Sequence, residues 1–263
     1  MHFAVNIPNF GAFADPRDLA GLAALAEGAG WDGVFVWDHV VRREGDVDLA
    51  DPWVALAAVA LATTRVAIGP MVTPLPRRRP WNVARAAVTL DHLSGGRMVL
   101  GVGLGTLAGP EFSAFGEETD PRVRGDQLDE GLAIVRAAWT GQPVEAHGTH
   151  YRVDGQRFWP RPVRGTVPLW AATTSVSGRA VRRAAGLDGV FPVGLTPGQV
   201  TELVGNVTAA RPPSLPAPEV IVLCSDDDPA PWAAAGATWW QRQLPWDQPL
   251  EVSRRLVAAG PPR

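Results

Sequence analysis

The sequence contains no lysine, and all 24 of its basic residues are arginines. With 27 acidic residues the formal net charge is −3, and the two signs are interspersed along the chain. Binding to nucleic acid or to an anionic membrane surface requires a basic patch or stripe, and the sequence has none. We therefore expect no nucleic-acid or membrane partner, and a small molecule as the ligand.

Cysteine is nearly absent as well. Cys224, the only one, lies inside the apolar run "EVIVLC", which excludes an internal disulfide and a zinc site built from cysteines. The start "MHFAVNIPNFG" has no basic region followed by an apolar stretch, and no window of the chain reaches the length of a membrane span. These absences predict a cytoplasmic protein.

Apolar runs of strand length alternate with helical patterns along the whole chain. The connections 106 to 121 and 141 to 168 are long, and "PVEAHGTHYRV" in the second of them has the pattern of a hairpin. The predicted strands cover residues 2 to 7, 33 to 38, 65 to 72, 97 to 105, 168 to 173, 189 to 194, 219 to 224 and 237 to 240. The predicted helices cover residues 16 to 28, 52 to 63, 80 to 92, 122 to 139, 177 to 185, 197 to 209, 229 to 235 and 249 to 259.

Eight strand–helix units in 263 residues match the size at which a (β/α)8 barrel closes as one domain. Several helices begin with proline, and Asp15, Asp51 and Thr196 precede them as predicted N-caps. A doubly wound sheet would open on a glycine-rich phosphate turn after its first strand, and "NIPNFGAF" does not fit that turn. We therefore predict an α/β protein whose residues 1 to 263 form a single (β/α)8 TIM barrel.

Polar residues at the carboxyl ends of barrel strands are the first candidates for an active site, because the adjoining loops form it. Asp38 and His39 end the strand "VFVWDHVV", where a buried strand would offer a carboxylate and an imidazole little water. As structural alternatives, Asp38 could cap the next turn and His39 could be a satisfied histidine at the edge of the core. The other members of the predicted ring are Asn6, Asn9, Thr73, Thr106, Thr173, Thr174 and Ser175.

A phosphate site is predicted in "TTSVSGR", residues 173 to 179, where hydroxyl residues and a glycine precede the N–H groups of a helix. The alternative interpretation is that Ser177 is only an N-cap. The start of the next helix along the chain offers similar groups. The predicted phosphate contacts are Thr174, Ser175, Gly178, Gly194 and Thr196.

Three further motifs have weaker interpretations. "GVGLG", which includes Gly103, is either a bend that lets another group approach the backbone or a weak dinucleotide motif. "RRRPW", residues 77 to 81, either offers guanidinium groups to an anionic ligand or is a solvated charge run. His147 and His150 would point to opposite faces of one strand, so we predict no metal site.

Long stretches of the chain resemble the luciferase-like monooxygenase superfamily of flavin- and deazaflavin-dependent enzymes. The most specific stretch is "DHLSGGRMVLGVGLG", residues 91 to 105. The others include "IPNFG", "AEGAGWDGVFVWDHV", "TTRVAIGPMVTPLPRRRPW", "EFSAFGE", "RGDQLDEGLAIVRAAW" and "AAGLDGVFPVG", and together they extend from about residue 3 to residue 195. The resemblance implies the same barrel, in a short member of the family.

The resemblance also implies a cofactor at the carboxyl-terminal mouth, either coenzyme F420 or FMN. It implies a non-prolyl cis peptide between Met71 and Val72, which would back the flavin ring. In the deazaflavin branch the Asp-His pair contacts the ring and the histidine can act as a base. By this resemblance Asp38 would hold the polar edge of the ring and His39 would be the acid–base group.

Two departures from the family pattern bear on the substrate. Sugar-phosphate dehydrogenases of the deazaflavin branch have a tryptophan four residues after the histidine and a glutamate after the fourth-strand glycines, where this chain has Arg43 and Thr106. A sugar-phosphate dehydrogenase is therefore disfavoured. The chain is also shorter than most relatives, so we expect a pocket that is open to bulky substrates or covered by a partner subunit in a homodimer.

The leading hypothesis is an oxidoreductase that passes a hydride between F420 and a small organic substrate. The close alternative is an FMN-dependent monooxygenase that receives reduced FMN from a partner flavin reductase. A barrel that binds flavin without catalysis is the third hypothesis. A metal-dependent hydrolase is the fourth, because the sequence shows no evident ligand set.

Overall fold

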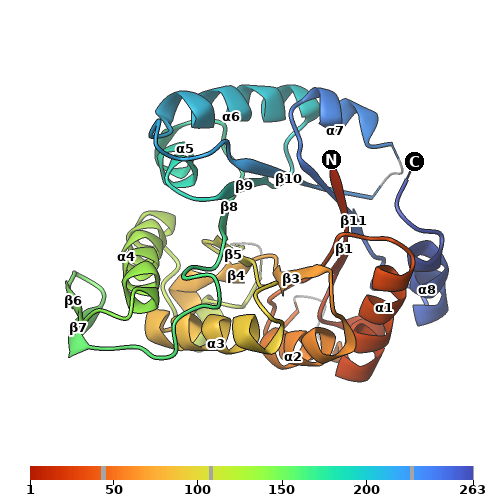
Figure 1. The fold of residues 1–263 in the computed structure, drawn as a ribbon, viewed down its shortest axis with the longest axis horizontal. Helices are drawn as coiled ribbons and strands as arrows, with labels where there is room; N and C mark the ends of the chain where they lie inside the picture. Colours follow the sequence, from red (N-terminus) through yellow and green to blue (C-terminus); the bar gives the residue numbers. More distant parts are fainter. Residues whose placement is uncertain (43–45, 107–108, 226–227, 263) are drawn as a thin grey trace.

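The strands and helices alternate in the predicted order around a barrel (Figure 1). The computed structural model describes residues 1–42, 46–106, 109–225 and 228–262. The barrel strands are β1 (His2–Ile7), β2 (Gly33–Val36), β3 (Ala67–Pro70), β4 (Thr73–Pro74), β5 (Leu100–Gly103), β8 (Leu169–Thr173), β9 (Gly189–Pro192), β10 (Glu219–Cys224) and β11 (Trp239–Gln243). The helices are α1 (Pro16–Gly28), α2 (Pro52–Ala62), α3 (Pro80–Leu93), α4 (Pro121–Trp139), α5 (Gly178–Ala185), α6 (Pro197–Ala210), α7 (Ala230–Ala234) and α8 (Leu250–Ala258).

The sheet closes on itself through the third predicted strand. The parallel order is β3-β2-β1-β11-β10-β9-β8-β5-β4. The predicted third strand corresponds to β3, and β4 follows directly after the end of its predicted range. The N–H of Ile68 in β3 donates to the carbonyl of Arg97, and the N–H of Val99 donates back to Ile68. The predicted (β/α)8 barrel is confirmed, and so is the hairpin, formed by β6 (Val144–His147) and β7 (Arg152–Gln156).

The break between β3 and β4 is the predicted cis peptide. The bond between Met71 and Val72 is cis and involves no proline, which confirms the prediction. Met71 and Val72, which we call the bulge, lie between β3 and β4, and both line the large cavity described below.

The period-two alternation of each strand separates two apolar layers. In β2, Val34 and Val36 point outward to the core beneath the helices, while Phe35 points into the barrel. Inside the barrel the Phe35 ring packs against Trp170 of β8 and Trp239 of β11, with ring centroids 5.4 and 6.0 Å away. These large rings fill the interior, so the lower part of the barrel is a packed core.

Three of the helices begin where the sequence predicts, because a side chain caps them. Asp15 accepts from the N–H of Arg17, and Asp51 accepts from two N–H groups at the start of α2. Thr196 and Gln199 form a capping box at the start of α6. None of the helices among the described residues has the length and apolar composition needed to span a membrane.

Arg97, which belongs to the stretch of residues 91 to 105, has a structural role at the amino-terminal end of the barrel. Arg97 donates to the carbonyl oxygens of Ala60, Thr63 and Val66, where α2 ends and β3 begins. A guanidinium can satisfy several of the carbonyls that a helix end leaves unpaired. Arg97 thus joins the start of β5 to the connection between α2 and β3.

The glycines of "GVGLG" allow the bulge to lie against β5. A Cβ at Gly101 would be 2.6 Å from the carbonyl oxygen of Pro70 and 2.8 Å from Met71 Sδ. A Cβ at Gly103 would be 3.1 Å from Val72 Cγ2. The prediction that this motif lets another group approach the backbone is confirmed, and that group is the bulge itself.

Gly101→Ala should therefore lower the free energy of unfolding by about 2 kcal/mol, because the new methyl group overlaps a backbone oxygen. Urea denaturation of the two proteins measures the difference. Gly21→Ala in α1 is the matched control, since a Cβ there would have no atom within 4 Å. Equal destabilisation by the two variants would contradict the close approach.

Candidate active site

A cavity of about 1070 Å³ opens at the carboxyl ends of the strands. Its lining comes from the loops that follow several strands, as expected for the active site of a barrel. One part of the wall is apolar and includes Met71, Val72, Ala172, Phe191 and Leu223. The polar part includes His39, Glu111, Thr106, Thr174, Ser175, Ser177 and Gly194. The size and this mixture suit a small-molecule site.

His39 stands at the wall of the cavity with its ring held on one side. Its Nδ1 lies 3.0 Å from Oε2 of Glu111, which belongs to the loop between β5 and α4. Asn9 clamps the backbone, since its Nδ2 donates to the His39 carbonyl at 2.8 Å and its Oδ1 accepts from the His39 N–H at 3.2 Å. The side chain of His39 is 19% exposed and that of Glu111 only 3%. With Nδ1 occupied, Nε2 is the ring nitrogen left to meet a ligand.

Glu111 is ionised in this buried position. Burial raises the pKa of its carboxyl, but the hydrogen bond and the charge of His39 act against burial. The N–H of Val40, which donates to Oε1 at 2.8 Å, and the charge of Arg77 lower the pKa further. The pKa of Glu111 is therefore about 2, against an ordinary value of 4.5. A carboxylate that accepts from Nδ1 keeps the proton of neutral His39 on that nitrogen.

The contribution of Glu111 to the free energy of unfolding should depend on pH. Its pKa of about 2 lies below 4.5, so the stability that Glu111 contributes is complete above pH 4.5 and is lost as the pH falls toward 2. The gap in unfolding free energy between the protein and Glu111→Gln should narrow by about 2 kcal/mol over that range, measured by urea denaturation. Glu202→Gln, on the exposed face of α6, is the control for loss of a surface carboxylate. A gap that stays constant with pH would contradict this account.

Asp38 is surrounded by donors from one short segment. Its carboxylate accepts from Thr73 Oγ1 at 2.8 Å, from Arg77 Nη2 at 2.9 Å, and from both Nε and Nη2 of Arg78 at 3.1 and 2.8 Å. The side chain of Asp38 is fully buried. All the accepting sites of the carboxylate are directed at these donors, which argues against the predicted contact with the edge of a ring. We expect Asp38 to act on the site through the arginines.

The structure contradicts one of the two sequence interpretations of the arginine segment. The side chain of Arg77 is 6% exposed and that of Arg78 is 24% exposed, so the alternative of a solvated charge run is wrong for these two residues. Arg77 begins no helix and lies at the end of the short turn η2 (Leu75–Arg77). Arg79 is exposed. Arg77 and Arg78 can be largely buried because they pair with the buried carboxylates of Asp38 and Glu111. A charge is stable inside a protein only when it is paired.

The predicted phosphate segment lies at the opposite rim. Ser175 and Thr173 bond within the loop: the N–H of Ser175 donates to Thr173 Oγ1 at 3.0 Å, and the N–H of Ser177 donates to Ser175 Oγ at 3.3 Å. Ser177 is at the N-cap position of α5, as the alternative interpretation has it, but its side chain makes no capping hydrogen bond. Arg183, which also lines the cavity, pairs with Asp129 of α4.

Comparison with known proteins assigns the family. The family model described as luciferase-like monooxygenase matches residues 1 to 259. The chain belongs to the luciferase-like monooxygenase family. The resemblance read from the sequence is thereby confirmed, and the match continues beyond residue 195 to nearly the end of the chain.

The curated relatives of this family member are longer proteins. An F420-dependent glucose-6-phosphate dehydrogenase from Beutenbergia cavernae is 38% identical over 175 residues, which is 65% of this chain and 50% of that protein. The chain spans about half the length of the curated relatives that it matches first.

Solved structures of the family share the barrel. An F420-dependent secondary alcohol dehydrogenase in complex with an F420-acetone adduct aligns with a TM-score of 0.79 and 19% identity, covering 98% of each chain. A monooxygenase from Streptomyces bottropensis aligns with a TM-score of 0.76 and 23% identity, also covering 98% of each chain. At these identities the structural matches establish the fold.

The structure brings most of the predicted residues to the cavity, but it places some of them elsewhere. Asn6 is completely buried, donates to Gln241 at 2.6 Å and accepts from the indole of Trp37, so it lies beneath the cavity wall. Thr73 is buried against Asp38, and the Thr196 hydroxyl is used by its capping box. The predicted residues that line the cavity are Asp38, His39, Met71, Val72, Gly103, Thr106, Thr173, Thr174, Ser175 and Gly194, whereas Asn6, Asn9, Thr73, Gly178 and Thr196 are outside its lining.

Glu111 is the site residue that the sequence analysis missed. The resemblance implies a glutamate after the fourth-strand glycines only in the sugar-phosphate dehydrogenases, and this chain has there Thr106, which also lines the cavity. The carboxylate that meets His39 instead follows five residues later in the same loop. An acidic residue in a loop at the carboxyl end of a strand was the available signal. Arg43, at the other departing position, lies outside the described residues.

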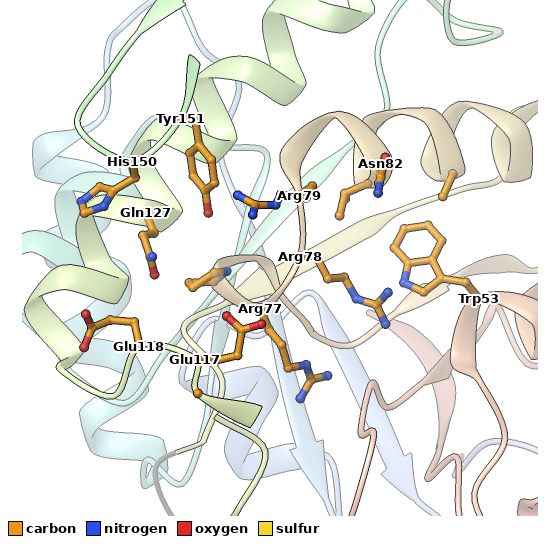
Figure 2. A pocket seen from close by; sticks show the side chains of 14 residues that line it. Trp53, Arg77, Arg78, Arg79, Asn82, Glu117, Glu118, Gln127, His150 and Tyr151 are labelled. Atoms are coloured by element: carbon orange, nitrogen blue, oxygen red, sulfur yellow. The ribbon is translucent and has the colours of Figure 1, made fainter. Parts of the chain in front are cut away.

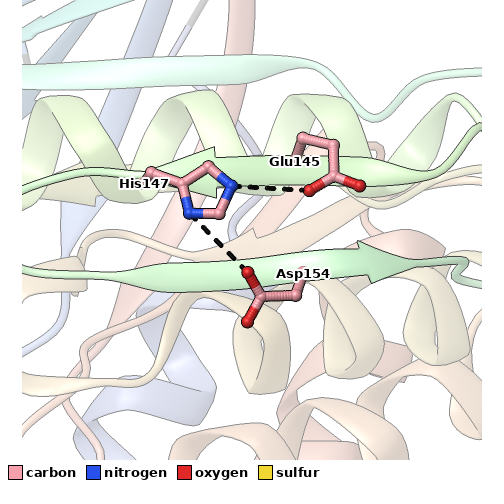
Figure 3. A group of neighbouring side chains, drawn as sticks. All are labelled: Glu145, His147 and Asp154. Carbon is pink, nitrogen blue, oxygen red and sulfur yellow. Dashed lines mark ion pairs between the residues drawn. The ribbon is translucent and has the colours of Figure 1, made fainter.

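A second cavity of about 750 Å³ lies beside the arginine segment (Figure 2). Arg79, Tyr151 and His150 line it. His147 is elsewhere, on the exposed face of the hairpin, 3.6 Å from both Glu145 Oε2 and Asp154 Oδ1 (Figure 3). The two histidines therefore do not share a site, as the sequence predicts, and the exposed pairs of His147 contribute little to stability.

Proposed function

We propose that this protein is an oxidoreductase that transfers a hydride between coenzyme F420 and a small organic substrate, with His39 as the acid–base group. The observation that carries the proposal is the pairing of His39 Nδ1 with Glu111 at the wall of the large cavity. It leaves a hydrogen-bonding nitrogen in a pocket with an apolar wall. Names of relatives with 38% identity support F420 as the cofactor.

The residues of the cavity fit such a cofactor. The bulge and its neighbours Ala172, Phe191 and Leu223 offer an apolar surface to one face of a planar ring. The N–H groups of Ser175 and Ser177 are used inside the loop, and so is the Ser175 hydroxyl proton. The exposed Thr174 and Gly194, which line the same cavity, are the groups that can meet a phosphate there. A Cβ at Gly194 would meet no atom within 4 Å, so this part of the rim is open space. Bound there, F420 supplies the acceptor or donor of the hydride.

The protein residues handle the proton that accompanies the hydride. When an alcohol is oxidised, its carbon loses a hydride to the cofactor and its oxygen loses a proton. His39 Nε2 is placed to take that proton, because Glu111 holds the other nitrogen and stabilises the resulting imidazolium. In the reverse direction the same nitrogen returns the proton to the carbonyl oxygen.

The substrate class follows from the same geometry. A hydroxyl or carbonyl group must reach His39, and the apolar wall favours a substrate with few charges. The relatives are named as glucose-6-phosphate dehydrogenases, but this chain covers only about half of their length. It also has Thr106 where the pattern of the sugar-phosphate dehydrogenases has glutamate. We therefore place secondary alcohols and ketones first, with glucose 6-phosphate as a separate arm of the test.

The single, buried Cys224 supports a cytoplasmic location.

An FMN-dependent monooxygenase is the second candidate, favoured by the monooxygenase description of the family model. FMN carries a similar ring and a phosphate, and a partner reductase would have to supply it in reduced form. Calorimetric titration with F420 and with FMN separates the two functions. We expect F420 to bind at least tenfold more tightly, a difference of about 1.4 kcal/mol.

Turnover completes this test. F420 oxidation or reduction that depends on an added alcohol or ketone supports the proposal. Tighter binding of FMN would support the monooxygenase. Binding of F420 without turnover over a panel of alcohols, ketones, enones and glucose 6-phosphate would support a barrel that binds the cofactor without catalysis.

Ser175→Asp should weaken F420 binding by tenfold or more, because a carboxylate at the predicted phosphate position repels the phosphate. Ser175 is exposed, so the fold should be unchanged. Calorimetric titration measures the affinity, and circular dichroism checks the fold. Ser113→Asp, at an exposed position outside the cavity lining, is the control. An unchanged affinity in Ser175→Asp would place the phosphate elsewhere.

A further inference from the structure

Arg77 connects the two carboxylates of the candidate site. Its Nη1 lies 3.0 Å from Glu111 Oε1, and its Nη2 lies 2.9 Å from Asp38 Oδ1. Nη2 also donates to the backbone carbonyl of Asp38 at 2.8 Å. The three side chains are nearly or completely buried, with 6% exposure for Arg77, 3% for Glu111 and none for Asp38. Arg77 therefore binds two loops that come from different strands.

The contact with Glu111 matters for the histidine. Glu111 uses Oε2 for His39 Nδ1, while Oε1 accepts from the N–H of Val40 and forms an ion pair with Arg77 Nη1. Nη1 makes no hydrogen bond with the described residues, so its effect on the carboxylate is that of a permanent charge held 3.0 Å from Oε1. Without it, Glu111 would lose one of the charges that favour its ionised form in a buried place.

Asp38 binds the other terminal nitrogen, Nη2, of the Arg77 guanidinium. It holds Arg77 by two atoms, the carboxylate and the backbone carbonyl, so the guanidinium cannot turn away from Glu111 without breaking both contacts. Asp38 follows β2 directly, and the backbone of the adjacent His39 is clamped by Asn9. The contacts thus form a closed ring of four residues that starts and ends after β2: Asp38, Arg77, Glu111 and His39.

We propose that Arg77 is a positioning residue for His39, acting through Glu111 to keep the proton of the neutral ring on Nδ1 and Nε2 free for the substrate. This proposal rests on the proposed function of His39 as the acid–base group. It explains the buried cation, which contacts neither His39 nor the large cavity. In this proposal Asp38 anchors Arg77, whereas His39 transfers the proton.

Arg78 provides a matched control on the same segment. It pairs with Asp38 at 2.8 Å and differs from Arg77 in contacting no glutamate among the described residues. Arg77→Gln and Arg78→Gln each remove one positive charge next to Asp38, but only the first releases Glu111.

The first test reads the His39 ring directly and needs neither cofactor nor substrate. Nitrogen-15 NMR of the imidazoles, of which the chain has five, reports which nitrogen carries the proton. The protein should have His39 protonated at Nδ1, and Arg77→Gln and Glu111→Gln should both convert it to a mixture of tautomers. Arg78→Gln should keep the tautomer of the unmodified protein. An unchanged tautomer in Arg77→Gln, or the same change in Arg78→Gln, would overturn the proposal.

The second test uses turnover. With an active substrate, Arg77→Gln should lower kcat by about 10- to 100-fold and change KM by only a few-fold, because the acid–base step is affected more than binding. Arg77→Lys should recover part of kcat, since an ammonium can hold one carboxylate but not both. If Arg77→Gln does not fold, Arg77→Lys carries both measurements, and a normal tautomer with normal kcat in it overturns the proposal. Absence of turnover in the unmodified protein would contradict the proposed function, while the NMR result still decides the role of Arg77.

Discussion

Replacing His39 with alanine should lower kcat by a factor of about 10² to 10⁴, the usual contribution of a positioned acid–base group. The affinity for F420 should stay within a few-fold, because the ring of His39 is only one part of a large wall. His39→Gln should be nearly as impaired, since an amide can keep a hydrogen bond but cannot exchange the proton. Steady-state kinetics with an active substrate measures both effects.

His147→Ala is the control for this prediction. That imidazole is 53% exposed on the hairpin, far from the cavity lining, and its removal should leave kcat unchanged. If His39→Ala and His39→Gln turn over at the normal rate, the pair of His39 and Glu111 is structural and the proposed mechanism is wrong. Reduced turnover with a large loss of F420 affinity would instead make His39 a binding residue.

Asp38→Asn should destabilise the protein by about 3 to 5 kcal/mol, the usual cost of leaving a buried charge without its partner. The amide has nearly the shape of the carboxylate, but it cannot neutralise Arg77 and Arg78, which both lie within 2.9 Å of Oδ1. Its NH2 group would also face a guanidinium that only donates. Urea denaturation at neutral pH measures the loss.

The control for Asp38 is an exposed carboxylate with the same partner type. Asp154 pairs with Arg152 at 2.9 Å, and the side chains are 59% and 71% exposed. Asp154→Asn should cost less than about 1 kcal/mol, because surface pairs are screened by water. Equal effects of Asp38→Asn and Asp154→Asn would show that the arginine cluster is not a buried ion-pair network.

The positions of Asp38 and His39 at the mouth of the barrel could be predicted from the sequence, because a strand that ends in charged residues is readable from its own letters. Their roles could not. The donors that occupy Asp38 come from Thr73, Arg77 and Arg78, which are 35 to 40 residues away in the chain. No local pattern shows which side of a loop an arginine will face, so the arginine segment read as a surface run.

Glu111 illustrates the same limit over a longer separation. It lies 72 residues from His39 in the chain, in a loop without regular structure at that point. Periodicity constrains strands and helices, but the path of such a loop depends on what packs beneath it. Here Glu111 and the neighbouring Phe112 are both buried, and Phe112 packs against Arg124 of the following helix α4. The family resemblance pointed to position 106 and away from the glutamate that the fold supplies.

The sequence by itself determined the barrel and its local devices: the alternation of strands and helices, the caps at Asp15, Asp51 and Thr196, and the glycines of "GVGLG". Each of these depends on contacts within a short segment or on a repeating period, and both are visible in the letters. Only the tertiary structure decided which polar groups face the cavity and which form hydrogen bonds with one another. That choice depends on burial, since a polar group without water must find a partner wherever the fold brings one. Asn6 and Thr73 found partners below the cavity wall, whereas His39 kept one nitrogen for a ligand.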